Sequence, residues 1–90
     1  MSKHHQTHPE IVKRLKRANG HLAKIISMIE HETPCLEVAQ QFEAVVQALL
    51  SAKKTFVQDH ISHCLDASVL KDAKTLKKKV ADFKEITKYL

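Results

Sequence analysis

Hydrophobic residues recur at helical spacing in three successive segments of the chain. In the first segment they are separated alternately by four and three residues, which is the period of a helix with one apolar face. These positions are Ile11, Leu15, Ala18, Leu22, Ile25 and Ile29. Thr7 and Glu10 have the spacing of a capping box, so we expect this helix to begin near Thr7 and to end near residue 30.

The second segment, 33–64, is the longest and carries two apolar faces. One face consists of Val38, Phe42, Val45, Leu49, Ala52 and Phe56, and its neighbour of Ala39, Val46, Leu50 and Val57. Thr33 and Pro34 suit the N-cap and the first position of a helix, and no Gly or Pro follows before Cys64. A helix with two apolar faces has to be buried from both sides.

A third amphipathic helix is expected from about residue 72 to 89, after a connection at 65–71. Its apolar positions are Ala73, Leu76, Val80, Phe83 and Leu90. Because the connection at 31–33 is short, the first two helices should form an antiparallel hairpin. The prediction is an all-α protein with a three-helix protomer, a single domain over 1–90 whose N-terminus, 1–7, is mobile and His-rich.

The amino-acid composition narrows the class of protein. One Gly and two Pro among many Ala, Leu, Lys and Glu fit an all-helical chain. The two Cys lie in one expected helix and cannot pair there, so free thiols indicate a reducing, cytoplasmic compartment. The polar start of the chain lacks the apolar core of a signal peptide, and no apolar run approaches the ~18 residues of a membrane span.

The net charge of the 90-residue chain is +5, which favours a polyanionic partner. Nucleic acid comes first and an anionic membrane second. A solvated, lysine-rich surface is the simpler explanation of the charge when it is considered alone.

Cysteine and histidine residues stand at both ends of the long second segment. His60 and Cys64 are four residues apart, so they share one helix face and can bind one metal ion. Cys35 lies roughly 37 Å away along the helix, far beyond a metal–sulfur bond of about 2.3 Å. A second chain, running antiparallel and crossing at Leu49 and Leu50, would bring its own cysteine to the pair. The spacing therefore predicts a two-fold dimer with two equivalent metal sites.

The hairpin also indicates the source of a fourth ligand. Residues whose numbers sum to about 65 should lie opposite each other along the axis of the hairpin, so His60 should lie opposite His5. His4 and His5 are therefore candidates, and His8 lies about a turn lower. Two thiolates and an imidazole suit Cu(I), Zn(II), Ni(II) or Co(II), and another nitrogen donor favours the last three. Two buried thiols and a surface histidine are the alternative without a metal.

A block of basic residues occupies the first helix, at Lys13, Arg14, Lys16 and Arg17, with Lys24 further along. Arginine can form paired hydrogen bonds with phosphate, so the block is a candidate DNA-binding surface, with a solvated face as the alternative. Lys53 and Lys54 interrupt the apolar positions of the second helix, so we expect the side of the helix that carries them to be exposed and basic. Gly20 lies inside the first helix and permits close approach of another helix or a ligand. His21 and His31 are expected to be surface residues.

Catalysis has little support in the sequence. There is no Gly-rich phosphate loop, no pair of carboxylates near the histidines and no arrangement of Ser, His and Asp that indicates a triad. A nucleophile pair of His60 and Cys64 is the weaker alternative to a metal site. The expectation is a binding protein and not an enzyme.

Several motifs resemble the CsoR/RcnR family of bacterial metal-sensing repressors, and the resemblance covers nearly the whole chain. The motifs are RLKRANGHL at 14–22, Cys35 after the short turn, AQQ at 39–41 and DHISHC at 59–64. The final DFKEITKYL at 82–90 resembles the NreA-type nickel-resistance members. The resemblance implies helical hairpins that pair into a four-helix bundle and then into a tetramer. It also implies a basic surface that binds operator DNA and releases it when the effector binds.

Carried over by position, the resemblance implies that Cys35, His60 and Cys64 are metal ligands shared between subunits. His4 or His5 would take the N-terminal fourth position of nickel and cobalt sensors. The implied DNA contacts are Lys13, Arg14, Lys16, Arg17 and Lys54.

The resemblance also bears on the identity of the metal. Pro34 stands where copper sensors are expected to have an aromatic neighbour of the metal site. Together with the N-terminal histidines, this favours nickel or cobalt, with copper and zinc as the alternatives. Two alternatives use the same Cys and His residues: a cytoplasmic metal carrier that binds no DNA, and a thiol-redox sensor.

Overall fold

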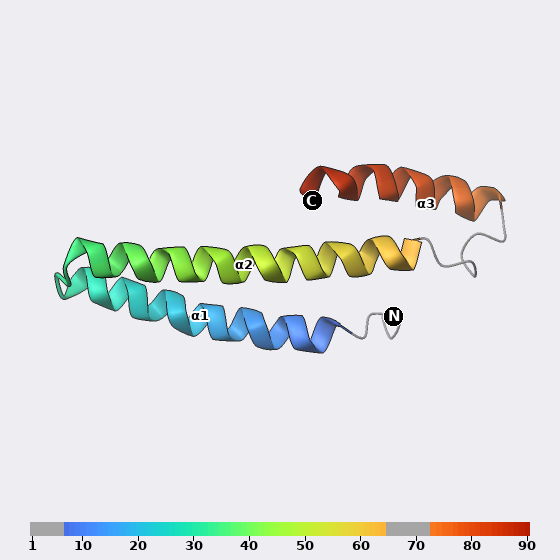
Figure 1. The fold of residues 1–90 in the computed structure, drawn as a ribbon. Helices are drawn as coiled ribbons and strands as arrows, with labels where there is room; N and C mark the ends of the chain where they lie inside the picture. The colour runs from blue at the N-terminus through green and yellow to red at the C-terminus, as the bar shows by residue number, and fades with distance from the viewer. Residues whose placement is uncertain (1–6, 65–72) are drawn as a thin grey trace. The chain divides into compact units, whose positions relative to one another are not determined.

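The computed structural model of the chain describes residues 7–64 and 73–90. These residues form three α-helices, α1 at His8–Glu30, α2 at Cys35–Cys64 and α3 at Ala73–Ile86 (Figure 1). A short 3-10 helix, η3 at Thr87–Tyr89, follows α3. The all-α prediction is confirmed, with helix ends close to those expected from the sequence. The expected mobile N-terminus, up to residue 6, and the expected connection at 65–71 lie outside the described residues.

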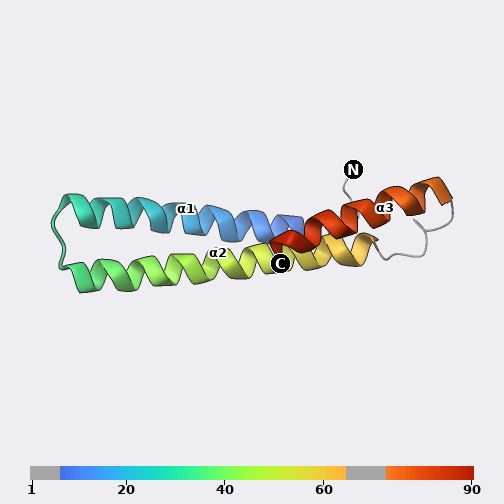
Figure 2. The same ribbon diagram turned by 90° about the horizontal axis from the view of Figure 1, so that it is seen from above.

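The chain divides into two compact units. One comprises residues 9–53, and the other comprises residues 54–90 together with 1–8. In the first unit, α1 and α2 run antiparallel and side by side (Figures 1 and 2). The predicted hairpin is therefore confirmed. No helix in the described ranges is both long enough and apolar enough to cross a bilayer.

The hairpin turn is a Schellman motif that ends α1 without a glycine. The Thr33 amide donates to the Met28 carbonyl at 2.9 Å, and the Glu32 amide donates to the Ile29 carbonyl at 3.1 Å. Glu32 has a φ of 56°, the left-handed conformation that this motif requires. The turn thus holds a side chain in a conformation that favours glycine.

The start of each helix differs in detail from the prediction. The Thr7 hydroxyl is buried and has no hydrogen-bond partner in the described part of the chain, so the predicted capping box is wrong. Its other member, Glu10, lies instead 4.0 Å from the Arg14 guanidinium, one turn along the helix. At α2, the Pro34 carbonyl accepts the first hydrogen bonds, from Glu37 at 3.0 Å and from Val38.

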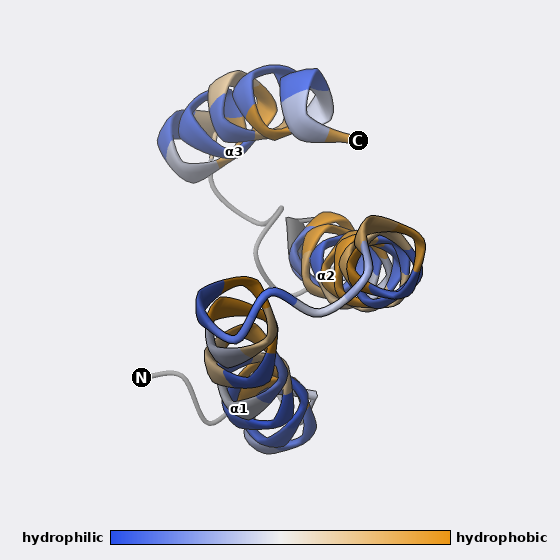
Figure 3. Cartoon of the chain, turned by 90° about the vertical axis from the view of Figure 1, so that its left-hand side faces the viewer, coloured by the Kyte–Doolittle hydropathy of each residue, from blue (hydrophilic) through white to orange (hydrophobic). Residues whose placement is uncertain are grey.

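Residues spaced by seven along both helices form the interface inside the hairpin. The buried positions of this series are Ile11, Ala18 and Ile25 on α1, and Val38, Val45 and Ala52 on α2, and Val57 of α2 is buried outside the series. Ile25, Val38 and Val45 form the central cluster, against which Met28 packs. Figure 3 shows α1 with its hydrophobic side turned toward α2. Burying an Ile or Val side chain contributes roughly 1.5–3 kcal/mol, and an Ala less, so this seam holds the two helices together.

The hairpin has two opposite faces beside this seam. Helical geometry places residues one or four positions after each buried one on one flank, and residues one or four positions before it on the other. The first flank, here named the apolar face, consists of Leu15, Leu22, Ile26, Ile29, Phe42, Val46 and Leu49. The second, here named the basic face, consists of Arg14, Arg17, His21, Lys24, Gln41, Ala48 and Ser51. Every side chain of the apolar face is at least 37% exposed.

In the second unit, the beginning of α1 is held against the end of α2. The ring of His8 stacks on that of Phe56, with centroids 5.2 Å apart and planes inclined by 15°. The His8 Nε2 also lies 3.9 Å from an Asp59 carboxylate oxygen. On α3, the apolar residues Leu76 and Val80 are 40% and 44% exposed.

Candidate metal centre and nucleic-acid interface

The expected metal ligands lie at the two ends of α2. Cys35 is the first residue of this helix and Cys64 is its last, with His60 one turn before Cys64. Cys35 is an exposed, free cysteine, and His60 is half-buried. His4 and His5 lie outside the described residues. Since one continuous helix separates Cys35 from the other two, a single chain does not bring the three together.

The described residues contain no assembled metal-binding group. Within 7–64 and 73–90, no set of three or more His, Cys, Asp and Glu side chains is placed so that it could hold a metal ion.

The surroundings of Cys35 are apolar and open. A groove on the apolar face is lined by Ile29, Glu32, Thr33, Pro34, Cys35, Val38, Ala39 and Phe42. The cysteine therefore lies at one end of the same exposed apolar surface that runs along the hairpin. A group that covers this surface would also reach the thiol.

The contacts of His8 show which part of α2 lies beside the start of α1. His8 lies against Phe56 and Asp59, which are respectively four residues and one residue before His60 in the sequence. The numbers of the stacked pair sum to 64, close to the value of about 65 expected for opposite residues of the hairpin. The start of α1 therefore lies beside the part of α2 that precedes His60.

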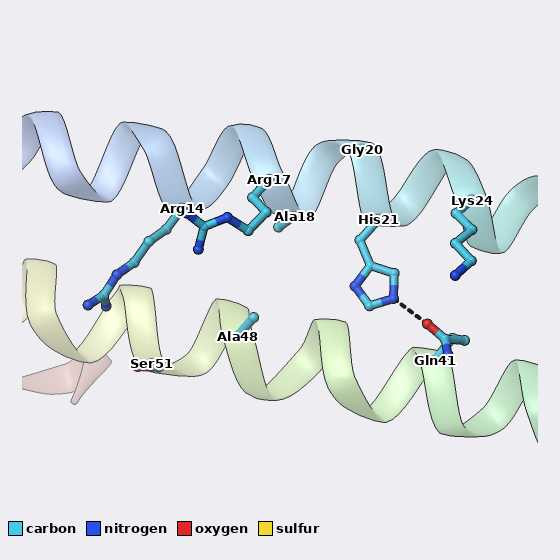
Figure 4. A pocket seen from close by; sticks show the side chains of 9 residues that line it. All are labelled: Arg14, Arg17, Ala18, Gly20, His21, Lys24, Gln41, Ala48 and Ser51. Carbon is cyan, nitrogen blue, oxygen red and sulfur yellow. Dashed lines mark hydrogen bonds between the residues drawn. The ribbon is translucent and has the colours of Figure 1, made fainter.

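The basic face forms the second candidate site. Its open groove lies between α1, which supplies Arg14, Arg17, His21 and Lys24, and α2, which supplies Gln41, Ala48 and Ser51 (Figure 4). Lys13 and Lys16 are exposed on the outer side of α1, and Lys54 is exposed on α2. The Arg14 guanidinium lies at the edge of ion-pair distance from Glu10, a contact that contributes little at an exposed position. The cationic side chains of the basic face are thus available to a phosphate.

A hydrogen bond joins the two walls of this groove. The Nε2 atom of His21 and the Oε1 atom of Gln41 lie 2.6 Å apart, and Figure 4 shows the imidazole pointing from α1 to the amide on α2. The expectation that His21 is a surface residue is wrong, because the side chain is half-buried and bonded across the hairpin. His31 is exposed, as expected.

Gln41 was not identified as a site residue from its chemistry. A glutamine on a helix is usually solvated, so its chemistry alone indicated no role. Gln41 was named only as part of the AQQ motif that carries the family resemblance. Its position three residues after Val38 and four before Val45, both buried, was the available signal. That spacing places it beside the seam, where its amide can reach the other helix.

Three comparisons with known proteins agree on one family. The model of a family described as metal-sensitive transcriptional repressor matches residues 7–89. The copper-sensing transcriptional repressor CsoR of Mycobacterium ulcerans is 40% identical over 57 residues, which cover 63% of this chain and 49% of that protein. The copper-sensing repressor RicR of Mycobacterium tuberculosis is 39% identical over 57 residues, covering 63% and 59%. The chain thus spans only about half to three-fifths of the length of these two relatives.

Two further similarities extend over most of the chain. CsoR of Bacillus subtilis is 32% identical over 81 residues, which cover 88% of this chain and 80% of that protein. The solved structure of the nickel-responsive transcriptional regulator InrS superimposes with a TM-score of 0.78 at 26% identity, covering 96% of each chain. The structural match is thus to a nickel-responsive protein, whereas the sequence matches named here are to copper sensors.

Proposed function

The chain belongs to the family of metal-sensitive transcriptional repressors, and we propose that it binds operator DNA without metal and releases it when metal binds. The match of the family model over residues 7–89 is the observation that carries this proposal. Family membership also agrees with the expectation of a binding protein and not an enzyme.

The basic face is the surface proposed to contact DNA. Four cationic residues of α1, Lys13, Arg14, Lys16 and Arg17, lie within a little more than one turn. Arg14 and Arg17 belong to the basic face. Lys13, Lys16 and, on α2, Lys54 are further exposed cations proposed to contact DNA. Arginine and lysine contacts to phosphate fix a protein on the duplex and make its affinity depend steeply on salt. The +5 charge of each chain doubles in a dimer and favours the same partner.

The apolar face is the surface proposed to bind a second copy of the chain. An exposed apolar surface of this extent is costly in water, and a two-fold dimer would cover it on both chains at once. If the second α2 runs antiparallel, its Cys35 meets His60 and Cys64 of the first chain. The four-helix bundle that results would carry two equivalent sites, and further pairing would give a tetramer.

Nickel or cobalt is the metal proposed for these sites. Two thiolates and an imidazole from Cys35, His60 and Cys64, with a nitrogen from His4 or His5, give four donors that suit Ni(II) or Co(II). The structural similarity to a nickel-responsive regulator supports this assignment. Copper and zinc are the alternatives, because the sequence relatives named above are copper sensors.

Titration of metal into a protein–DNA complex tests the proposal. Labelled duplexes that tile the region upstream of the chain's own gene serve as the DNA, and fluorescence anisotropy reports binding at fixed salt. We expect metal-free protein to bind one duplex in preference to the others, and Ni(II) or Co(II) to release it. Since coupling is reciprocal, the same DNA should weaken metal binding by the same factor.

The matched variants are Cys35→Ala and Gln40→Ala, which change one exposed residue each on α2. Cys35→Ala should bind the duplex as wild type does and fail to release it on adding metal, whereas Gln40→Ala should behave as wild type in both respects. A complex that survives saturating metal, or metal binding without any preferred duplex, would contradict the repressor and favour a metal carrier.

A further inference from the structure

Gly20 occupies an unusual position in the interior of α1. It is the only glycine of the sequence, and it does not adopt a positive φ. A Cβ atom built at this position would meet nothing within 4 Å in the described part of the chain. Neither backbone conformation nor packing among the described residues therefore requires glycine, although glycine weakens a helix relative to alanine. The described residues therefore supply no reason for the missing side chain.

The neighbours of Gly20 on the helix surface are cations. Lys16 and Arg17 lie one turn before it, and Lys24 lies one turn after it, at the spacing that brings side chains together. Lys13 lies two turns before it on the same side. All four are exposed, and Arg17 and Lys24 line the groove of the basic face together with Gly20 (Figure 4). A bare stretch of helix thus lies in the middle of a stripe of positive charge.

We infer that Gly20 is the point where a phosphodiester backbone of duplex DNA approaches α1 most closely, between Arg17 and Lys24. This inference rests on the proposed function and assigns a contact residue to it. Charge selects the occupant, because phosphates of the duplex complement the four cations around the glycine. A second copy of this chain would bring a second cationic stripe against the first, and the exposed apolar face offers it a better surface.

The substitution Gly20→Lys separates close approach from simple attraction. If only charge matters, an added lysine strengthens DNA binding and steepens its dependence on salt. If the backbone passes close to the glycine, the new side chain holds it away from Arg17 and Lys24. We then expect an affinity at least about tenfold lower, roughly the loss of one hydrogen bond to a charged group, and a shallower salt dependence.

Ser27→Lys is the matched control, because it adds the same charge to the same side of α1, two turns further on. It should bind at least as tightly as wild type. Gly20→Ala completes the series and should weaken binding less than Gly20→Lys. Affinities are measured by anisotropy in metal-free buffer, with the labelled duplex from upstream of the chain's own gene that wild type binds best.

Thermal unfolding by circular dichroism provides the second readout. Because nothing in the described chain meets the added Cβ atom, Gly20→Ala should raise the unfolding midpoint by a few degrees while it weakens DNA binding. A lower midpoint or a weaker dimer would overturn the inference in favour of a contact between copies. Equal or tighter binding by Gly20→Lys would also overturn it. In that case wild-type binding and metal release would leave the repressor proposal standing, whereas wild type that binds no duplex would reject both.

Discussion

His21 and Gln41 join the two helices of the hairpin across the basic groove, with 2.6 Å between Nε2 and Oε1. One partner lies on α1 between Arg17 and Lys24, and the other lies on α2 between two buried valines. The bond therefore ties the cationic helix to the apolar seam. It fixes the distance between the two walls of the groove in which the proposed DNA contacts lie.

A double-mutant cycle on this pair should show coupling. We expect His21→Ala and Gln41→Ala each to lower the free energy of unfolding by about 1 kcal/mol, because each leaves a half-buried polar group without its partner. The double variant should cost little more than either single one. Urea unfolding at one protein concentration measures the three values. Additive losses would show that the two side chains act independently.

Replacing Glu32 by glycine should stabilise the hairpin turn. A left-handed conformation costs a residue with a side chain about 1–2 kcal/mol, and glycine avoids this cost at some expense in the unfolded chain. Glu32→Gly should therefore stabilise the protein by about 0.5–1 kcal/mol in thermal or urea unfolding.

Glu30→Gly is the control for this prediction, because Glu30 ends α1 in helical conformation. It should destabilise the protein by up to about 1 kcal/mol. If Glu32→Gly destabilises to the same extent, the side chain of Glu32 contributes more to the turn than its backbone strain costs.

The periodicity of apolar residues was sufficient to predict the hairpin, because the seam residues recur every seven positions on both helices. The failures concern local polar contacts. Thr7 and Glu10 have the spacing of a capping box, yet the Thr7 hydroxyl has no partner in the described chain and the Glu10 carboxylate lies 4.0 Å from the Arg14 guanidinium. The left-handed residue of the turn is a glutamate, which no glycine signal marks.

The candidate site was predictable only as a set of separated parts. Spacing along α2 shows that Cys35 cannot reach His60 and Cys64 in one chain, and the described residues contain no assembled metal group. The ligand set, and the second chain proposed to bring its donors together, therefore stay predictions. Single-sequence reasoning also treats each polar side chain alone, which is why the bond between His21 and Gln41 was missed.

Dimer formation through the apolar face can be tested without touching a metal ligand. Leu49 is 37% exposed and lies near the middle of α2, where the proposed two-fold axis passes. Leu49→Glu would bury two carboxylates without partners in each dimer, weakening association by at least about 2 kcal/mol, roughly thirtyfold. Sedimentation equilibrium should show more monomer, and the affinity for Ni(II) should fall with it.

Gln40→Glu is the control for Leu49→Glu, since it introduces the same charge at an exposed position on α2 away from the apolar face. It should leave association and metal affinity unchanged. A monomeric Leu49→Glu protein that binds Ni(II) as tightly as wild type would reject a site shared between chains.

Mild oxidation should report directly on the direction in which the two α2 helices run. Cys35 is free and exposed, and in an antiparallel dimer it faces Cys64 of the partner subunit. Diamide treatment of metal-free protein should then give a crosslinked dimer on a non-reducing gel, and Ni(II) should slow the reaction by engaging the thiolates. Cys35→Ser or Cys64→Ser alone should abolish the product, because a bond between unlike cysteines needs both. A dimer that forms with Cys35 alone would place the two helix starts together and would show that the chains run parallel.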